Sequence, residues 1–205
     1  YNVDNVLGVM AALRALQLPL NQVIEVCASL QAVPGRMEKV VGVEGIELPL
    51  TVVDYAHTPD AVMQTLSNLK RVTQSLNTKL WCVLGCGGDR DVSKRPLMAA
   101  AAEAAADHVV LTSDNPRTES PAAIVQDMLQ GMKMPQAAYQ ELDRAKAIAY
   151  AVMHADKRDV ILIAGKGHED TQEIAGVKHP FDDRLHAHEA LVSRANTMAS
   201  MEVRS

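Results

Sequence analysis

The sequence predicts an α/β fold in which a doubly wound, mainly parallel (Rossmann-like) sheet begins with a β-hairpin and is preceded by two helices. Three short apolar runs, at residues 80–84, 109–112 and 160–164, have the length of buried strands. Segments with helical apolar spacing lie between these runs and are long enough to return the chain to the same end of a sheet. Strands that alternate with helices in this way indicate parallel crossovers.

Two helices are expected before the sheet. Residues 3–17 carry apolar side chains at helical spacing and stop before Pro19, and a second helix is expected from about residue 21 to residue 30. Two helices alone have little to pack against, so they are expected to belong to a domain whose remainder is not in this sequence. Residues 33–36, Val-Pro-Gly-Arg, break the pattern and predict a linker into the next domain.

The expected hairpin pairs residues 37–43 with residues 46–53 around a Gly-containing turn. The predicted order continues with helix 58–75, strand 80–84, helix 96–106, strand 109–112, helix 121–131, helix 142–155, strand 160–164 and helix 184–196. The tail after residue 196 is expected to fray. A functional role for Asp182, Asp183 and Arg184 before the last helix stays open, although capping and complementarity with the helix dipole are enough to explain the two acids.

Composition narrows the function classes. The 205 residues are 48% hydrophobic, which is enough for one well-buried domain and a fragment of another. The net charge of -5 and the lack of a Lys/Arg-rich run argue against binding to a nucleic acid polymer. No apolar run approaches the roughly 20 residues of a membrane helix. The three cysteines lack zinc-site or disulfide spacing, which predicts buried thiols in a cytoplasmic protein. Without an initiator Met or a signal-peptide pattern, the sequence is expected to be a piece of a longer chain.

Polar loops follow the three core strands. They read Gly85-Cys86-Gly87-Gly88-Asp89-Arg90-Asp91, Asp114-Asn115-Pro116-Arg117 and Gly165-Lys166-Gly167-His168-Glu169-Asp170. Because the carboxyl ends of parallel strands meet at one edge of a sheet, we expect these loops to lie side by side. Arg90 and Arg117 suit carboxylates, whereas Asp114 and Glu169 suit ammonium groups. The set fits an amino acid with two charged ends.

Simpler interpretations of these residues remain open. Residues 114–117 also suit an ordinary Pro-stiffened turn, and Arg90 stands where a dinucleotide fingerprint would have its third glycine. The chain has no Gly-x-x-x-x-Gly-Lys-Ser/Thr phosphate loop. After the hairpin, Asp54 suits ribose hydroxyls and His57 suits a phosphate, although helix capping by Thr58 with a buried His57 explains that loop equally well.

Six motifs in order resemble the Mur ligase family. They are Tyr-Asn-Val-Asp-Asn, Gly-Arg-Met-Glu, Val-Asp-Tyr-Ala-His-Thr-Pro-Asp, Gly-Cys-Gly-Gly-Asp-Arg-Asp, Asp-Asn-Pro-Arg-Thr and Ala-Gly-Lys-Gly-His-Glu. The resemblance is to members that join meso-2,6-diaminopimelate to UDP-N-acetylmuramoyl-L-alanyl-D-glutamate in peptidoglycan precursor synthesis. It implies that residues 1–34 end the family's central ATP-binding domain and that residues 35–205 form its C-terminal, amino-acid-binding domain.

The resemblance also implies site residues. The meso-diaminopimelate pocket would comprise Arg90, Asp114, Asn115, Pro116, Arg117, Gly165 and Glu169, and the nucleotide would be bordered by Asn2, Asn5, Arg36, Asp54 and His57. Arg117 would grip the carboxylate that lysine lacks, so lysine would leave it unpaired at a cost of roughly 1 to 3 kcal/mol. No catalytic residue and no metal ligand is expected in this chain.

In the reaction that the resemblance implies, the γ-phosphate of ATP passes to the D-glutamyl carboxylate, and the diaminopimelate amine attacks the acyl phosphate. ATP and Mg²⁺ would be held mainly by the upstream central domain, so this ADP-forming activity is not expected from the chain alone. Its partners would be UDP-N-acetylmuramoyl-dipeptide and the N-terminal and central domains. A lysine-adding relative is disfavoured by Arg117, and a folylpolyglutamate synthetase has no reason to carry residues 114–117 as they stand. The alternative is a non-enzymatic α/β module that binds an amino acid or a nucleotide.

Overall fold

The computed structural model describes residues 2–28 and 33–202, and the chain divides into two compact units, Tyr1–Val33 and Pro34–Ser205. The first unit contains the two expected helices, α1 (Asn2–Ala15) and α2 (Leu20–Ala28). The last two residues expected in the second helix lie outside the described part of the chain. Val23 is the one buried side chain among the described residues of this unit, while Leu7 and Ile24 are more than half exposed. This pair of helices therefore encloses little core of its own.

The second unit is built on a six-stranded sheet with the strand order β1-β2-β6-β3-β4-β5. Its strands are β1 (Glu38–Lys39), β2 (Leu50–Asp54), β3 (Leu80–Cys86), β4 (His108–Ser113), β5 (Tyr139–Gln140) and β6 (Val160–Ala164). Only the pairing of β1 with β2 is antiparallel, and the other four pairings are parallel. The predicted mainly parallel α/β sheet is confirmed.

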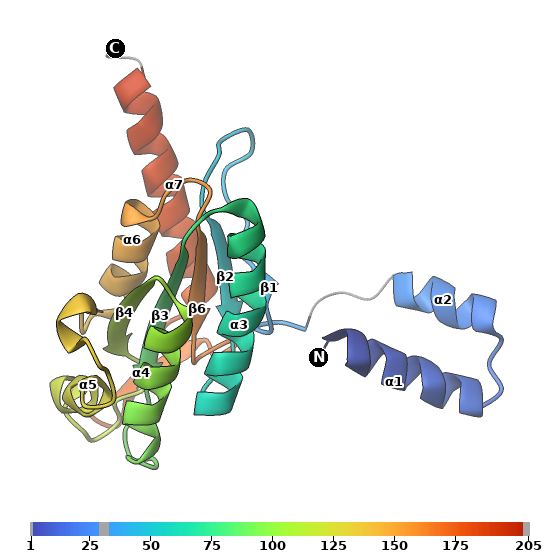
Figure 1. Cartoon of the computed structure of the whole chain (residues 1–205), viewed down its shortest axis with the longest axis horizontal. Coiled ribbons are helices and arrows are strands. Elements are labelled where there is room, and N and C mark those ends of the chain that lie inside the picture. The colour runs from blue at the N-terminus through green and yellow to red at the C-terminus, as the bar shows by residue number, and fades with distance from the viewer. Residues whose placement is uncertain (1, 29–32, 203–205) are drawn as a thin grey trace. The chain divides into compact units, whose positions relative to one another are not determined.

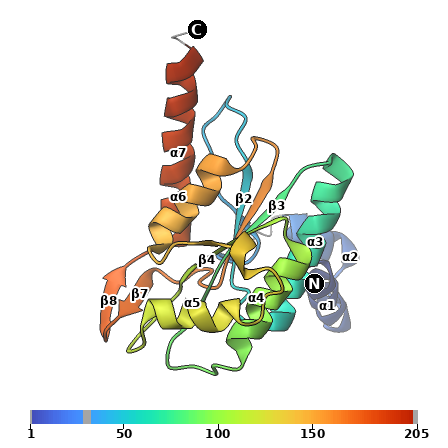
Figure 2. The same cartoon turned by 60° about the vertical axis from the view of Figure 1, so that its left-hand side comes forward.

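Helices cover both faces of this sheet (Figures 1 and 2). One face packs against α3 (Pro59–Leu76), α4 (Lys94–Ala105) and α5 (Pro121–Leu129), and the other against α6 (Arg144–His154) and α7 (Asp183–Glu202). Successive side chains of a strand point to opposite faces of the sheet, so β3 contributes to the hydrophobic core on both faces. Leu80, Cys82 and Leu84 pack on the face of α3, α4 and α5. Trp81 and Val83 pack on the opposite face. The apolar run of the central strand is therefore explained by burial on both faces.

Local sequence signals set the ends of α3, which leads into the central strand. The hydroxyl of Thr58 accepts a hydrogen bond from the backbone N–H of Ala61 at 3.3 Å, and Pro59 occupies the first turn. At the other end, Asn77 adopts the left-handed conformation with a φ of 52°. These two caps fix where α3 starts and stops, and so where β3 begins.

Several local predictions need correction. The hairpin strands are much shorter than expected, because Gly42, Gly45 and Pro49 interrupt the ladder and only Glu38–Lys39 pairs with β2. The last helix does not fray after residue 196 but continues to Glu202. Four elements were not predicted: β5, a 3₁₀ turn at Pro135–Ala137, and the two strands of a separate hairpin, β7 (Thr171–Ile174) and β8 (Val177–Pro180). Their sequences are short and largely polar, so they lack an apolar period.

Asp183 does more than cap a helix. Its side chain and that of Arg144 are both 0% exposed, and they form an ion pair with an N–O distance of 2.7 Å. Arg144 also donates to the backbone oxygens of Ser113 at 3.1 Å and Ala164 at 3.0 Å. Ser113 and Ala164 are the last residues of β4 and β6. The buried ion pair thus ties together the strand ends from which two of the polar loops leave.

Candidate functional site

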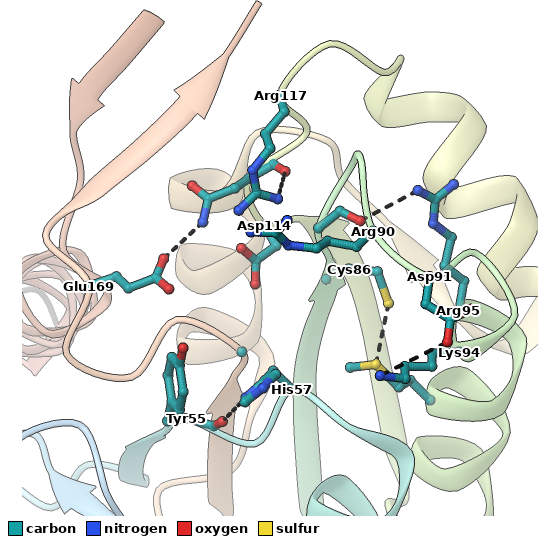
Figure 3. Close-up of a pocket in the computed structure, with 15 residues that line it drawn as sticks. Tyr55, His57, Cys86, Arg90, Asp91, Lys94, Arg95, Asp114, Arg117 and Glu169 are labelled. Atoms are coloured by element: carbon teal, nitrogen blue, oxygen red, sulfur yellow. Dashed lines mark hydrogen bonds and ion pairs between the residues drawn. The ribbon is translucent and has the colours of Figure 1, made fainter. Parts of the chain in front are cut away.

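A cavity of about 480 Å³ opens where the parallel strands end (Figure 3). It is lined by Tyr55, His57, Gly85, Cys86, Gly87, Arg90, Asp91, Lys94, Arg95, Met98, Asp114, Asn115, Arg117, Gly165 and Glu169. These residues come from the ends of β2, β3, β4 and β6 and from the start of α4. The loops after β6, β3 and β4 lie next to one another because those strands are neighbours in the sheet. The expected adjacency of the three polar loops is confirmed, and the cavity has a size typical of small-molecule sites.

The loop after β4, residues 114–117, is held in place by backbone contacts. Arg117 has a φ of 52°, a left-handed conformation that a non-glycine residue adopts only when its surroundings enforce it. Its N–H donates to the carbonyl of Glu173 at 2.9 Å, and its carbonyl accepts from Ala175 at 2.6 Å. The amide of Gln172 donates to the backbone oxygen of Asp114 at 2.7 Å. The unpredicted strand β7 is therefore the brace of this loop.

Close packing requires glycine at several positions, of which Gly88 and Gly165 border the polar loops. A Cβ atom on Gly88 would lie 2.0 Å from the carbonyl oxygen of Pro116, and one on Gly165 would lie 2.6 Å from Asp114 Oδ2. Gly165 also has a φ of 119°, which side chains rarely tolerate. Both glycines let neighbouring loops approach within direct contact. The predicted site residue Gly165 thus has a clear local reason to be glycine.

Two of the acids that line the pocket, Asp114 and Glu169, are held differently. Asp114 is buried, and burial raises the pKa of its carboxyl group, although the positive charges of Arg144 and Lys166 oppose that rise. Glu169 is one third exposed and accepts a hydrogen bond from the Asn115 side-chain amide at 2.8 Å. Both carboxyl groups line the same cavity. Together they form an acidic side suited to ammonium groups.

Two of the cations that line the cavity, Arg90 and Arg117, reach it from the loops after β3 and β4. Arg90 is exposed, and within the described residues its side chain has no hydrogen-bond or ion-pair partner. Arg117 donates through Nη1 to the carbonyl of Gly88 at 2.7 Å, and its Nε lies 3.7 Å from Glu173 Oε2. In Figure 3 both guanidinium groups extend toward Asp114. A ligand that carries both charge signs would therefore meet cations and carboxylates in one space.

Sequence reasoning missed Arg95, whose side chain also lines the cavity. It is 3% exposed, and its Nη1 and Nη2 pair with Asp127 at 2.9 Å and Glu119 at 2.8 Å. Its Nε is buried without a hydrogen-bond partner. An Arg in the first turn of a helix ordinarily looks like a surface residue, so the only available signal was its place just after the glycine-rich loop.

Three of the predicted nucleotide residues, Arg36, Asp54 and His57, lie near Tyr55. His57 is exposed, lines the cavity and lies 2.8 Å from the carbonyl of Tyr55 through Nδ1, whereas Thr58 caps α3. Arg36 is exposed, with its guanidinium 4.8 Å from the centre of the Tyr55 ring. Asp54 is 2% exposed, and its two oxygens accept hydrogen bonds from the Met37 N–H and the Thr65 hydroxyl.

The remaining two predicted residues are on α1. Asn5 is exposed and belongs to the first unit, and the side chain of Asn2 lies outside the described residues. Within the described part of the chain, no group of three or more His, Cys, Asp or Glu side chains is arranged to hold a metal ion. No described helix is long and apolar enough to cross a membrane.

Curated relatives match almost the whole chain. The family model described as "Mur ligase, glutamate ligase domain" matches residues 35–167. Proteins named UDP-N-acetylmuramoyl-L-alanyl-D-glutamate--2,6-diaminopimelate ligase are 53% identical in Acidovorax sp. (strain JS42) and 48% identical in Coxiella burnetii, over 95% and 93% of this chain. The chain spans 38% of the length of each of these relatives.

Two solved structures of ligases are also similar to this chain. One of a UDP-N-acetylmuramoyl-L-alanyl-D-glutamate--2,6-diaminopimelate ligase is 44% identical over 93% of this chain and 38% of its own, with a TM-score of 0.69. A UDP-N-acetylmuramate-alanine ligase from Thermotoga maritima, at 22% identity, shares the fold with a TM-score of 0.65 over 96% of this chain and 38% of its own. The match of the family model over more than half of the sequence shows that this chain belongs to the Mur ligase family.

Proposed function

We propose that this chain is the amino-acid-binding C-terminal part of an ATP-dependent ligase that adds meso-2,6-diaminopimelate to UDP-N-acetylmuramoyl-L-alanyl-D-glutamate. Relatives about half identical to it over nearly its whole length carry that name. The observation that carries the proposal is that Arg90 and Arg117 line the same cavity as Asp114 and Glu169. Diaminopimelate has two carboxylates and two ammonium groups, which match these two kinds of side chain.

Arg117 supports the choice of diaminopimelate over lysine. The two amino acids differ by one carboxylate, and a guanidinium group recognises a carboxylate with two parallel hydrogen bonds. Nη1 of Arg117 donates to the carbonyl of Gly88 and Nε lies 3.7 Å from Glu173 Oε2, and these contacts hold the guanidinium group at the cavity. Within the described residues Nη2 has no partner, so it remains for a ligand. If lysine bound, the guanidinium would lose water without gaining a partner, at a cost of roughly 1 to 3 kcal/mol.

The chain's own residues would bind and orient the attacking amino acid. In the proposed reaction the D-glutamyl carboxylate becomes an acyl phosphate, the amine nitrogen forms the new C–N bond, phosphate leaves, and the amine loses a proton. Fixing both charged ends of diaminopimelate would hold that amine in one place, which lowers the entropic cost of the attack. Closure of this domain over the one that carries ATP would complete the site and exclude water.

We assign the other parts of the reaction to the rest of the ligase. The ATP phosphates and the Mg²⁺ ion that balances their charge would be held mainly by the upstream domain, of which Tyr1–Val33 would be the end. Arg36 and His57 are exposed and suit the edge of a nucleotide site. Asp54 would act indirectly there, by holding the backbone of Met37. A cytoplasmic location follows from the nucleotide substrates that the proposal implies.

The test is an assay of the full-length ligase for ADP release, with ATP, the UDP-linked dipeptide and either meso-diaminopimelate or L-lysine. We expect release with diaminopimelate and little with lysine. Arg117→Ala should lower kcat/KM for diaminopimelate about tenfold to a hundredfold. Arg71→Ala, at an exposed position of α3, serves as the control and should leave activity unchanged. Equal use of both amino acids, or no use of diaminopimelate, would refute the proposed function.

A further inference from the structure

Lys166 is a fully buried lysine in a loop that borders the cavity. Its side chain is 0% exposed. Burying an ammonium group is costly unless its protons are hydrogen-bonded. Those of Lys166 have three acceptors: Nζ lies 2.6 Å from Thr171 O, 3.2 Å from Glu169 Oε2 and 3.3 Å from Asn115 Oδ1. No proton is left for a ligand, so Lys166 is not itself a group that binds phosphate or substrate.

The lysine determines which way the Asn115 amide points. Asn115 Oδ1 accepts from Lys166 and also from the backbone N–H of Glu173 at 2.9 Å. With its oxygen held by two donors, the amide must direct Nδ2 to the other side, where it donates to Glu169 Oε2 at 2.8 Å. The flipped amide would set its NH₂ group against an ammonium and an N–H, which are both donors.

Glu169 receives two of these contacts on the same oxygen. Oε2 accepts from Lys166 and from Asn115, which fixes the rotation of the carboxylate. Within the described part of the chain, Oε1 has no hydrogen-bond partner, and the side chain is 34% exposed at the wall of the cavity. One oxygen is thus bound by the protein, and the other is left for a donor on a ligand.

We propose that Lys166 is a positioning residue for the amino-acid site: it orients Asn115 and Glu169 so that one oxygen of Glu169 is presented to an ammonium group. This inference rests on the proposed function for the identity of the ligand. Without the ammonium of Lys166, Asn115 Oδ1 keeps a single donor and the amide is free to turn, while Glu169 loses its charged partner. Affinity for the amino acid then falls, whereas affinity for ATP does not change.

A lysine with only a structural role would behave differently. Its loss would lower stability and reduce the affinity for every substrate alike. A lysine that acts through Glu169 matters only while the Glu169 carboxylate is present. A double-mutant cycle on these two residues therefore separates the two roles.

The experiment compares Lys166→Met, Glu169→Gln and the double variant in the full-length ligase. Each single change should raise the KM for meso-diaminopimelate about tenfold and leave the KM for ATP within about twofold. The KM of the double variant for meso-diaminopimelate should not exceed the higher of the two single-variant values. Lys146→Met is the matched control, since Lys146 pairs with an acid three residues away but is 73% exposed. An unchanged KM for diaminopimelate in Lys166→Met, or effects that multiply in the double variant, would overturn the proposal.

A second measurement needs no substrate and holds even if Lys166→Met fails to fold. In a nitrogen-15 NMR spectrum of the wild-type full-length ligase, the ammonium signal of Lys166 should exchange slowly with water and should shift in Glu169→Gln. The exposed ammonium of Lys146 should exchange fast. If Lys166 exchanged as fast as Lys146, the inferred network would be wrong. If the ligase did not use diaminopimelate while the slow signal was present, the proposed function would fail and the network would stand.

Discussion

Two buried arginines, Arg144 and Arg95, hold the candidate site from opposite faces of the sheet. Arg144 starts α6, and its partner Asp183 is as buried as Arg144 itself. Arg95 is in the first turn of α4, but its partners Glu119 and Asp127 are about one third exposed. The Arg144 pair is closed off from water and fixes strand ends, whereas the Arg95 pairs fix surface loops and helices. The comparison teaches that the ion pair on one face of the sheet is shielded from water, whereas the ion pairs on the other face are partly open to it.

The largest effect should come from Arg144→Met. This change leaves the Asp183 carboxylate buried without its partner and frees the ends of β4 and β6. We expect the free energy of unfolding to fall by about 3 to 5 kcal/mol, measured by urea denaturation. Adding Asp183→Leu should recover much of the loss, because the stranded charge is removed. If Arg144→Met alone were as stable as the wild type, the Arg144 pair would not contribute more to stability than the Arg95 pairs.

Gly88→Ala should cause the second largest loss in the free energy of unfolding. The added Cβ would lie 2.0 Å from the backbone oxygen of Pro116, so the loops after β3 and β4 would have to separate. We expect a loss of at least about 2 kcal/mol in the free energy of unfolding. In the control Gly176→Ala nothing lies within 4 Å, and only the strain of a φ of 77° remains, at about 1 kcal/mol. Equal losses in both variants would show that the loops are not in tight contact.

Arg95→Met should lower the free energy of unfolding by less than Arg144→Met or Gly88→Ala. Because its acidic partners are partly exposed, we expect a loss of about 1 to 2 kcal/mol that shrinks at about 1 M salt. The loss from Arg144→Met should change little with salt, since that pair is closed off from water. Urea denaturation of both variants at low and high salt checks this. The same salt dependence for both would remove the distinction between the two faces.

The smallest effect concerns pH and Asp114. Burial raises the pKa of this carboxyl group in the folded state, so the folded protein binds a proton more tightly than the unfolded chain does. Stability is therefore lost as pH rises from the ordinary pKa of Asp through the raised pKa of Asp114. In Asp114→Asn this loss should vanish, which unfolding measurements between about pH 4 and pH 8 would show. Parallel pH profiles for variant and wild type would contradict the account.

The core strands of the sheet could be predicted from the sequence because buried strands consist of runs of apolar residues. The apolar runs around Val83, Val110 and Ile163 gave the core strands, and a parallel sheet then required their loops to share an edge. The buried charged groups left no such pattern. Arg144 and Asp183 are 39 residues apart, and each alone resembles an ordinary residue at a helix start. Only the tertiary structure brings them together.

For the site, the sequence pointed to several residues that line the cavity but not to the contacts that hold them. Polar loops after core strands pointed to Arg117, Asp114 and Glu169, all of which line the cavity. Lys166 was visible only as part of a weak Gly-Lys-Gly pattern, since its role depends on acceptors from two other segments. The brace formed by β7 was missed because strand pairing through backbone groups needs no particular side chains.

The most direct test of the central claim is a crystal structure of the full-length ligase with meso-diaminopimelate. The account predicts the amino acid in the cavity at the ends of β3, β4 and β6, with a carboxylate on the guanidinium of Arg117 and an ammonium group on the carboxylate of Asp114 or Glu169. Diaminopimelate bound elsewhere, or bound here with Arg117 turned away from both of its carboxylates, would contradict it.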